Sequence, residues 1–171
     1  MNPAETEACP MCGARGVGGS AGCQEIMHSV SNRVYSDPAL PSDYASYRAA
    51  VDCYALQHPE IYCVSAKSYA AHLAGLCCRM EFGGKQEIQS AIQEWLDGPV
   101  DMEKPPLLAQ RGEVTVLALT GAADPVGFTH IVDRWAESVW EAYAGLQGAA
   151  HSYIELALRE RQTRGKRAGK P

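Results

Sequence analysis

Hydrophobic residues recur at intervals of three and four along much of the chain, which is the spacing of a helix that buries one face. The clearest run has spacings of 3, 4, 3 and 4, at Tyr44, Tyr47, Val51, Tyr54 and His58. Ser42 precedes it as the expected N-cap, and Pro59 ends it because proline disfavours helical backbone in the preceding residue. We therefore expect a helix that ends at His58 and carries all five residues on one face.

The same periodicity predicts helices over residues 24–34, 65–82, 85–96 and 149–161. Ser65 is placed to cap the second of these, and Gly83-Gly84 ends it. A further long helix should follow Asp124, because an aspartate N-cap with proline at the first helical position is a strong start signal. Together with the helix before Pro59, these segments give five or six helices.

Two segments do not fit this pattern. Residues 13–22 contain five glycines, so we expect an irregular loop there. Residues 114–119 are apolar and include β-branched side chains, which favours a short strand or a buried extended segment.

The composition is that of one globular domain. The chain has 171 residues, 46% hydrophobic and 20% charged, which suffices for a single core. No apolar run reaches the roughly 18 residues that span a bilayer, and residues 1–7 lack the basic start of a signal peptide. We expect a cytoplasmic, mainly α, single-domain helical bundle over residues 1–158, with residues 1–23 as a zinc-bound loop packed on it.

Residues 159–171 form a basic segment, although the whole chain has a formal net charge of -5. The segment holds one acid and six cations: Glu160, Arg159, Arg161, Arg164, Lys166, Arg167 and Lys170. It lacks apolar periodicity, and no aromatic residues lie between the cations, so we expect a flexible, solvated tail. Because the rest of the chain is acidic, we do not expect a nucleic-acid partner.

Three cysteines are candidate metal ligands. Cys9 and Cys12 stand in a Cys-Pro-Met-Cys-Gly string, whose spacing lets two thiolates bind one zinc ion and whose glycine lets backbone amides approach the sulfur atoms. A redox Cys-x-x-Cys normally opens a helix after a strand, which this segment does not. Cys23 lies near an expected helix start, where the helix dipole should lower its pKa. We expect the remaining cysteines to be buried thiols: Cys53, Cys63, Cys77 and Cys78.

Three sulfur ligands leave one position of a tetrahedral zinc site, and three histidines could fill it. His28 follows Cys23 by five residues and so points off its i, i+4 face. His58 is preferred because it lies at a helix end, where a loop can close over it, while His72 on the next helix stays an alternative. The expected ligands are Cys9, Cys12, Cys23 and His58.

Asp52 has two interpretations. It could orient a histidine, because metal-bound imidazoles usually donate their second N–H to a carboxylate or carbonyl, or it could be an ordinary exposed helix residue. His130 and His151 have no partner nearby in sequence, so we expect both at the surface or at the edge of the core.

Several motifs together resemble a family of small bacterial proteins of unknown function. The most specific is the Val-Asp-x-Tyr-x-x-Gln-His-Pro string at 51–59; the others are the cysteine knuckle at 9–13, Gly-Cys at 22–23, Asp-Pro at 37–38, Ser-Tyr-Ala-Ala-His at 68–72 and Trp-Ala-Glu-Ser-Val-Trp at 135–140. In that family a histidine often stands where this chain has Tyr47, and nothing corresponds to His28. The resemblance therefore favours His58 over His28 as a ligand, and it implies no known reaction.

Two functions from different classes remain. In the first, four protein ligands close a structural zinc site, and the helical body binds an unidentified protein or small molecule. In the second, zinc keeps an open position and Asp52 or His72 is the acid or base of a hydrolase- or lyase-type enzyme. The number of protein ligands separates the two, because four of them leave no place for a reactive water.

Overall fold

The computed structural model describes residues 7–37 and 44–168, and within these ranges it is mainly helical with no strand. Six of its α-helices have eleven residues or more: α2 (Gly19–Ser36), α3 (Tyr44–Gln57), α5 (Ala66–Phe82), α6 (Gln86–Leu96), α7 (Pro125–Ala142) and α8 (Gln147–Ala168). Helix α4 (Pro59–Tyr62) and the 3-10 turns η1 (Val116–Gly121) and η2 (Ala144–Leu146) are short connectors. The expected mainly α, single-domain fold is confirmed.

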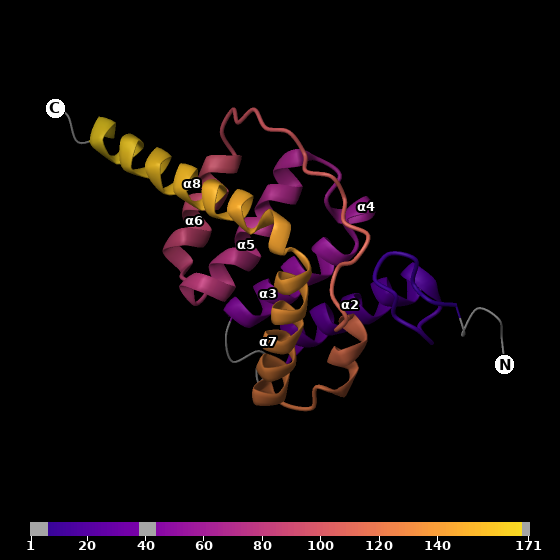
Figure 1. Ribbon diagram of the computed structural model, residues 1–171. Helices are drawn as coiled ribbons and strands as arrows, with labels where there is room; N and C mark the ends of the chain where they lie inside the picture. The colour runs from indigo at the N-terminus through magenta and orange to yellow at the C-terminus, as the bar shows by residue number, and fades with distance from the viewer. Residues whose placement is uncertain (1–6, 38–43, 169–171) are drawn as a thin grey trace.

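Helix α5 is the centre of the bundle. It packs against α3, α6, α7 and α8, and α3 packs in turn against α7 (Figure 1). Eight residues of α5 are buried, including Tyr69, Leu73 and Leu76. The largest buried side chain, Trp135, comes from α7. Helix α2 lies at the periphery, where it contacts η1, and it adds Cys23, Met27 and Val30 to the edge of the core.

Local capping signals predicted two helix starts correctly. The Ser65 hydroxyl accepts a hydrogen bond from the Ser68 amide at 3.0 Å, and α5 begins at Ala66. The Asp124 carboxylate accepts one from the Gly127 amide at 2.8 Å, and α7 begins at Pro125. Each cap satisfies an amide that has no partner within its own helix.

The first helix begins earlier than expected. Helix α2 starts at Gly19, so the end of the glycine-rich segment is helical and only its first part is a loop. Gly22 explains how the turn closes, because a β-carbon there would overlap the backbone carbonyl of Val17. The missing side chain lets the loop pack directly against the first turn of the helix.

The short strand or buried extended segment predicted over residues 114–119 is wrong, because Val116–Leu119 lie in a 3-10 helix. That segment enters η1, whose buried residues are Val116 and Leu119. A strand needs a neighbouring strand to satisfy its backbone groups, and the described chain offers none. The spacing of three between the buried residues is the period of a 3-10 helix, which satisfies its own backbone.

Helix α8 continues through Leu158 to Ala168, so the described part of the segment expected to be a flexible tail is helical. In Figure 1 its end projects beyond α6. Arg161 donates to the Glu87 carbonyl at 2.7 Å and lies 3.5 Å from the Glu94 carboxylate. The domain boundary at residue 158 stays a prediction.

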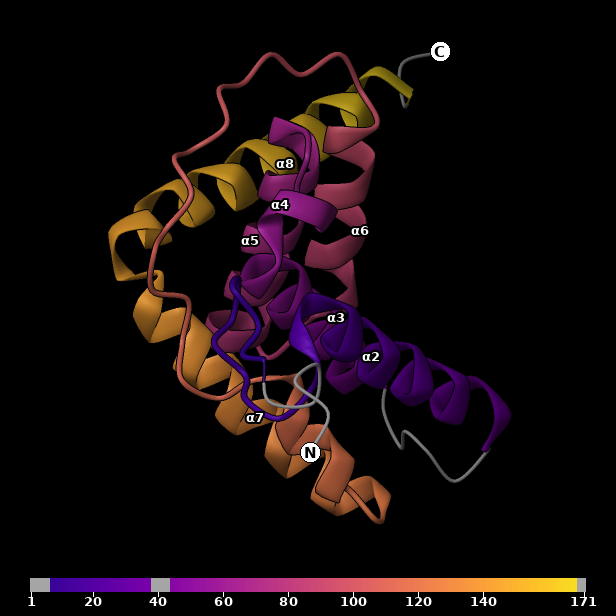
Figure 2. The same ribbon diagram turned by 90° about the vertical axis from the view of Figure 1, so that its right-hand side faces the viewer.

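A long connection without regular structure, residues 99–115, runs from α6 to η1 and passes around the outside of the bundle (Figure 2). It is fastened near its end, where the amides of Glu113 and Val114 both donate to the Ser138 hydroxyl, at 2.8 and 3.0 Å. We call residues 99–115 the strap. Within the described part of the chain, no helix has both the length and the apolar character that crossing a membrane requires.

Candidate metal centre

The two cysteines of the knuckle stand on a tight backbone turn. The Cys9 amide donates to the Ala14 carbonyl and the Gly13 amide donates to the Cys9 carbonyl, each at 2.8 Å. This turn folds residues 9–14 back on themselves and directs both sulfur atoms to one side. Cys9 is buried and Cys12 is half-buried.

The third cysteine comes from α2, which follows the knuckle directly. Cys23 is the fifth residue of that helix and is completely buried. Its sulfur lies 3.7 Å from the sulfur of Cys12. The short glycine-rich segment before α2 therefore carries the chain from the knuckle to a helix face that meets it.

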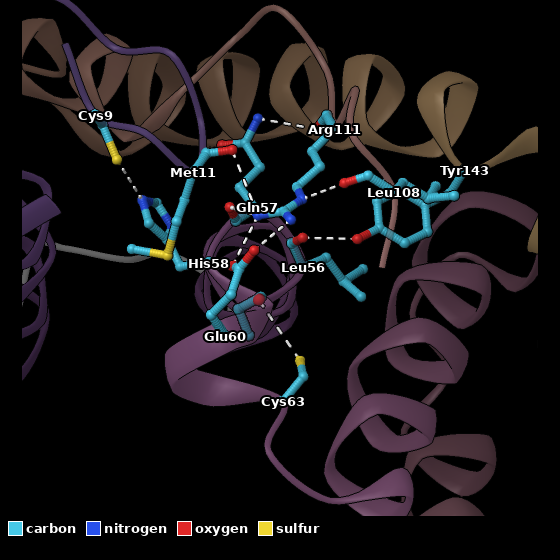
Figure 3. Close-up of polar contacts among 11 residues, drawn as sticks. Cys9, Met11, Leu56, Gln57, His58, Glu60, Cys63, Leu108, Arg111 and Tyr143 are labelled. Carbon is cyan, nitrogen blue, oxygen red and sulfur yellow. Dashed lines mark hydrogen bonds and ion pairs between the residues drawn. The ribbon is translucent and has the colours of Figure 1, made fainter. Parts of the chain in front are cut away.

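His58 lies at the junction of α3 and α4, as the position of Pro59 predicted. Helix α3 ends at Gln57, and Pro59 begins α4. The imidazole is completely buried, and its Nε2 lies 3.6 Å from the sulfur of Cys9 (Figure 3). Of the five residues expected on one face of this helix, Tyr47 and Tyr54 are buried, but Tyr44 is 71% exposed. The expected cap, Ser42, lies outside the described residues.

The four side chains form one compact group. One ligand atom from each of Cys9, Cys12, Cys23 and His58 lies within 4.8 Å of the other three. A tetrahedral zinc ion, with Zn–S near 2.3 Å and Zn–N near 2.05 Å, would place two sulfurs about 3.8 Å apart and a sulfur and a nitrogen about 3.6 Å apart. The observed 3.7 Å and 3.6 Å agree with these values. This group could hold a metal ion.

The orientation of His58 is fixed by its other nitrogen. Nδ1 lies 2.8 Å from the Tyr54 carbonyl oxygen, which can only accept, so Nδ1 carries the proton. Nε2 therefore presents a lone pair to the sulfur atoms. A backbone carbonyl that holds the second nitrogen is the usual outer support of a metal-binding histidine.

Burial sets the charge state of these groups in the absence of a cation. Burial raises the pKa of the Cys12 and Cys23 thiols, and the neighbouring Cys9 sulfur raises both further, whereas the contact between Cys12 and Cys23 lowers the pKa of Cys12 and raises that of Cys23. A hydrogen bond from the Ala14 amide acts in the opposite direction on Cys12. Burial also lowers the pKa of His58, which keeps the imidazole neutral. Buried thiols that resist ionisation become thiolates when a dication supplies the compensating charge.

The expected effect of the helix dipole on Cys23 is therefore wrong. Because α2 begins at Gly19, Cys23 lies beyond its first turn, where the dipole has largely fallen off. Desolvation is the larger influence and raises its pKa.

Arg111 of the strap joins the knuckle to the turn that carries His58. Its guanidinium donates to the Gln57 carbonyl at 3.2 Å and to the Met11 carbonyl at 3.5 Å, and it makes a two-point ion pair with Glu60 (Figure 3). Arg111 is 8% exposed. The Arg111 side chain thus links the knuckle, through Met11, to the turn before His58, through Gln57, although these segments are far apart in sequence.

The other candidate residues lie outside this group. His28 is exposed on α2. His72 donates from Nδ1 to the carboxylate of Asp52 at 2.8 Å, and Asp52 is 1% exposed. The carboxylate therefore does orient a histidine, but that histidine is not His58, and the exposed alternative for Asp52 is wrong.

Sequence reasoning missed a second group, formed by Cys77 and Glu81 of α5 and His151 of α8. The Nε2 atom of His151 lies 2.6 Å from the Glu81 carboxylate. The spacing of four between the α5 residues was the only sequence signal, because His151 comes from a distant helix. His130 is exposed, as expected.

A family model matches residues 7–144, which include the knuckle, His58 and the strap. The chain belongs to DUF5946, a family of unknown function. The sequence resemblance to a family of unknown function is confirmed at that level. No curated protein and no solved structure matches the chain. The function of this DUF5946 member is therefore inferred from its own residues and their geometry.

Proposed function

We propose that Cys9, Cys12, Cys23 and His58 hold one structural zinc ion, which fastens the knuckle and α2 to the end of α3. The observation that carries the proposal is the agreement of the sulfur–sulfur and sulfur–nitrogen separations with those of a tetrahedral site. Three soft thiolates with one imidazole favour zinc among the common divalent ions of the cell.

The ligand count supports a structural role over the hydrolase- or lyase-type enzyme. Four protein ligands saturate a tetrahedral ion and leave no position for a reactive water. Asp52 and His72, the acid and base of the enzyme hypothesis, bond to each other and do not belong to the four-residue group. Zinc would therefore act on folding rather than on a substrate.

The position of the ligands indicates what the ion would stabilise. Three ligands come from residues 9–23, and the fourth belongs to the helical bundle. Helix α2 contributes four buried residues: Gly19, Cys23, Met27 and Val30. Since a structural zinc ion couples binding to folding, we expect its removal to release the N-terminal segment while α5 and its neighbours stay folded.

Metal analysis of purified protein tests the proposal. We expect about one zinc per chain, and we expect Cys9→Ser, Cys12→Ser, Cys23→Ser and His58→Ala each to lower zinc content and melting temperature. Cobalt substitution reports sulfur count and coordination number directly, so the wild-type spectrum should be that of a tetrahedral site with three sulfurs.

Two matched variants serve as controls. Cys53→Ala removes a buried thiol outside the group, and His130→Ala removes an exposed imidazole. Both should keep full zinc content. Full zinc retention in the Cys9→Ser and Cys12→Ser double variant would reject the proposal. A cobalt spectrum that changes in His72→Ala but not in His58→Ala would reject the ligand assignment.

A further inference from the structure

A cavity of about 200 Å³ lies between α2, α3 and α5, and none of the four proposed zinc ligands lines it. The rings of Tyr47, Tyr54 and Tyr62 form part of its wall, and Ser31, His28 and His72 supply polar atoms. An apolar cavity of about 150 Å³ is enough to bind benzene, whereas drug-sized ligands need about 300 Å³ or more. The cavity therefore has room for one ring with a short polar substituent.

His72 presents a defined atom to this cavity. Because the Asp52 carboxylate only accepts hydrogen bonds, Nδ1 of His72 must donate in the 2.8 Å contact between them. In the neutral imidazole, Nε2 then carries the lone pair. The His72 side chain is 18% exposed whereas that of Asp52 is 1% exposed, so the histidine separates a buried carboxylate from the cavity.

The fold makes room for this pair at a cost. Gly75 lies one turn after His72 on α5, and a β-carbon there would overlap the Asp52 carboxylate. Burying a carboxylate is unfavourable, and the Nε atom of Arg48 lies 3.4 Å from the Asp52 carboxylate oxygen, which offsets little of that free-energy cost. A core whose only task was packing would gain from an apolar residue at position 52, so the arrangement indicates a role for the oriented histidine.

Two of the hydroxyl groups that line the cavity, those of Tyr47 and Ser31, already donate their protons to acceptors within the protein. Tyr47 donates to the Ser31 oxygen at 3.0 Å, and Ser31 donates to the Met27 carbonyl at 2.9 Å. Tyr47 and Ser31 therefore offer lone pairs to the cavity, as His72 does. A ligand beside these three groups must bring the hydrogen atoms, which favours a donor and disfavours a carboxylate.

We propose that the cavity between α2, α3 and α5 binds a small aromatic molecule that carries a hydroxyl or amine group, with that group donating to Nε2 of His72 and the ring lying among the three tyrosines. Tyrosine faces suit both a neutral ring and an ammonium group. The two ligand types share the donor group, and the experiment distinguishes them. The proposal uses side chains other than the zinc ligands and goes beyond the structural role of the metal.

The test is a titration of the zinc-loaded protein with benzyl alcohol, benzylamine, toluene and benzoate, followed by ¹⁵N NMR of the histidine rings. We expect benzyl alcohol or benzylamine to bind at least about tenfold more tightly than toluene and benzoate, since one hydrogen bond is worth about this factor. The stronger of the two identifies the ligand type. Binding should shift the Nε2 resonance of His72, which in the free protein should report a proton on Nδ1.

Variants locate the site. His72→Leu keeps the bulk but removes the acceptor, and it should weaken the better probe at least about tenfold, whereas Tyr47→Phe should weaken it less. His130→Leu, at an exposed position of α7, is the control and should change nothing. Zinc content and melting temperature are measured for each variant, so that a folding defect or metal loss is told apart from loss of the cavity.

Each of the following results would overturn the proposal. These are equal affinities of wild type and His72→Leu for every probe, benzoate binding as tightly as benzyl alcohol, and a proton on Nε2 of His72 in the free protein. The last is measured on the wild type and does not depend on any variant folding. Absence of binding by all four probes at millimolar concentration would also reject it.

Discussion

Replacement of Gln57 by leucine should be among the most destabilising single changes near the candidate metal centre. The Gln57 side chain is completely buried and makes three hydrogen bonds to distant parts of the chain. Its amide nitrogen donates to the carbonyls of Arg111 and Val114 at 3.1 and 2.8 Å, and its oxygen accepts from the Trp135 indole at 3.0 Å. Leucine cannot form these hydrogen bonds, so the two carbonyl groups and the indole N–H would each lose the Gln57 side chain as a partner.

The magnitude follows from those partners. A buried polar group that loses its partner costs about 1–3 kcal/mol. The Arg111 carbonyl and the Trp135 indole are in buried contacts, whereas the Val114 contact is half-buried and costs less. Leucine regains about 1 kcal/mol through its apolar side chain. We therefore expect a loss of about 2–4 kcal/mol, which is a large part of the 5–15 kcal/mol typical of a domain.

Urea unfolding of the zinc-loaded variants measures this loss as a lower midpoint at an unchanged slope. Gln57→Glu is the matched test of the mechanism, because it keeps the shape and the acceptor for Trp135 but removes both N–H donors and adds a buried charge. It should be at least as destabilising as leucine at neutral pH. Gln93→Leu, at an exposed position of α6, should change stability by less than about 0.5 kcal/mol. A loss below 1 kcal/mol in Gln57→Leu would refute the reasoning.

The fold predicts the effect of two further changes. Gly22→Ala should weaken zinc binding at least about tenfold in a competition assay with a chelator, since the new methyl group overlaps the Val17 carbonyl and displaces the adjacent Cys23. The control is Gly148→Ala, which has open space around it and should leave zinc binding unchanged. Removal of residues 159–171 should leave zinc content intact and lower the free energy of unfolding in urea by about 1–2 kcal/mol, because it deletes one hydrogen bond and one exposed ion pair of Arg161. Loss of zinc or of the cooperative unfolding transition would contradict this prediction.

Local signals in the sequence predicted most of the helices. Ser65 and Asp124 act on amides three residues away, so their effect does not depend on the rest of the fold. The helix predicted over residues 85–96 is likewise found as α6, whose buried residues Ile88, Ile92 and Trp95 follow the spacing of three and four. The errors arose where tertiary contacts decide, at residues 114–119 without a strand partner and at Gly19–Gly22, where a close approach to Val17 favours helix over loop.

The candidate metal group was predictable because chemistry restricts it. Only a few residue types bind zinc, and Pro59 marked the helix end where His58 meets the knuckle. The hydrogen bonds that support this group are not limited to a few residue types in the same way. Gln57 and Arg111 are 54 residues apart, and His151 and Glu81 are 70 apart. Any buried glutamine or arginine satisfies some backbone carbonyl, and the sequence does not say which one.

Tyr54 connects the two proposed sites. Its carbonyl holds the Nδ1 proton of His58, its ring lies 4.3 Å from the His58 imidazole between centroids, and the same residue lines the cavity beside His72. Removal of zinc would release α2, which supplies Met27, His28 and Ser31 to the cavity wall, and would free His58 beside Tyr54. A cavity ligand should therefore bind the zinc-free protein more weakly. Linkage makes this reciprocal, because a ligand that prefers the metal-bound state must raise zinc affinity by the same factor. Equal affinity of the better aromatic probe for the zinc-loaded and chelated protein would show that both α2 and Tyr54 keep their places without the metal, and that the two sites act independently.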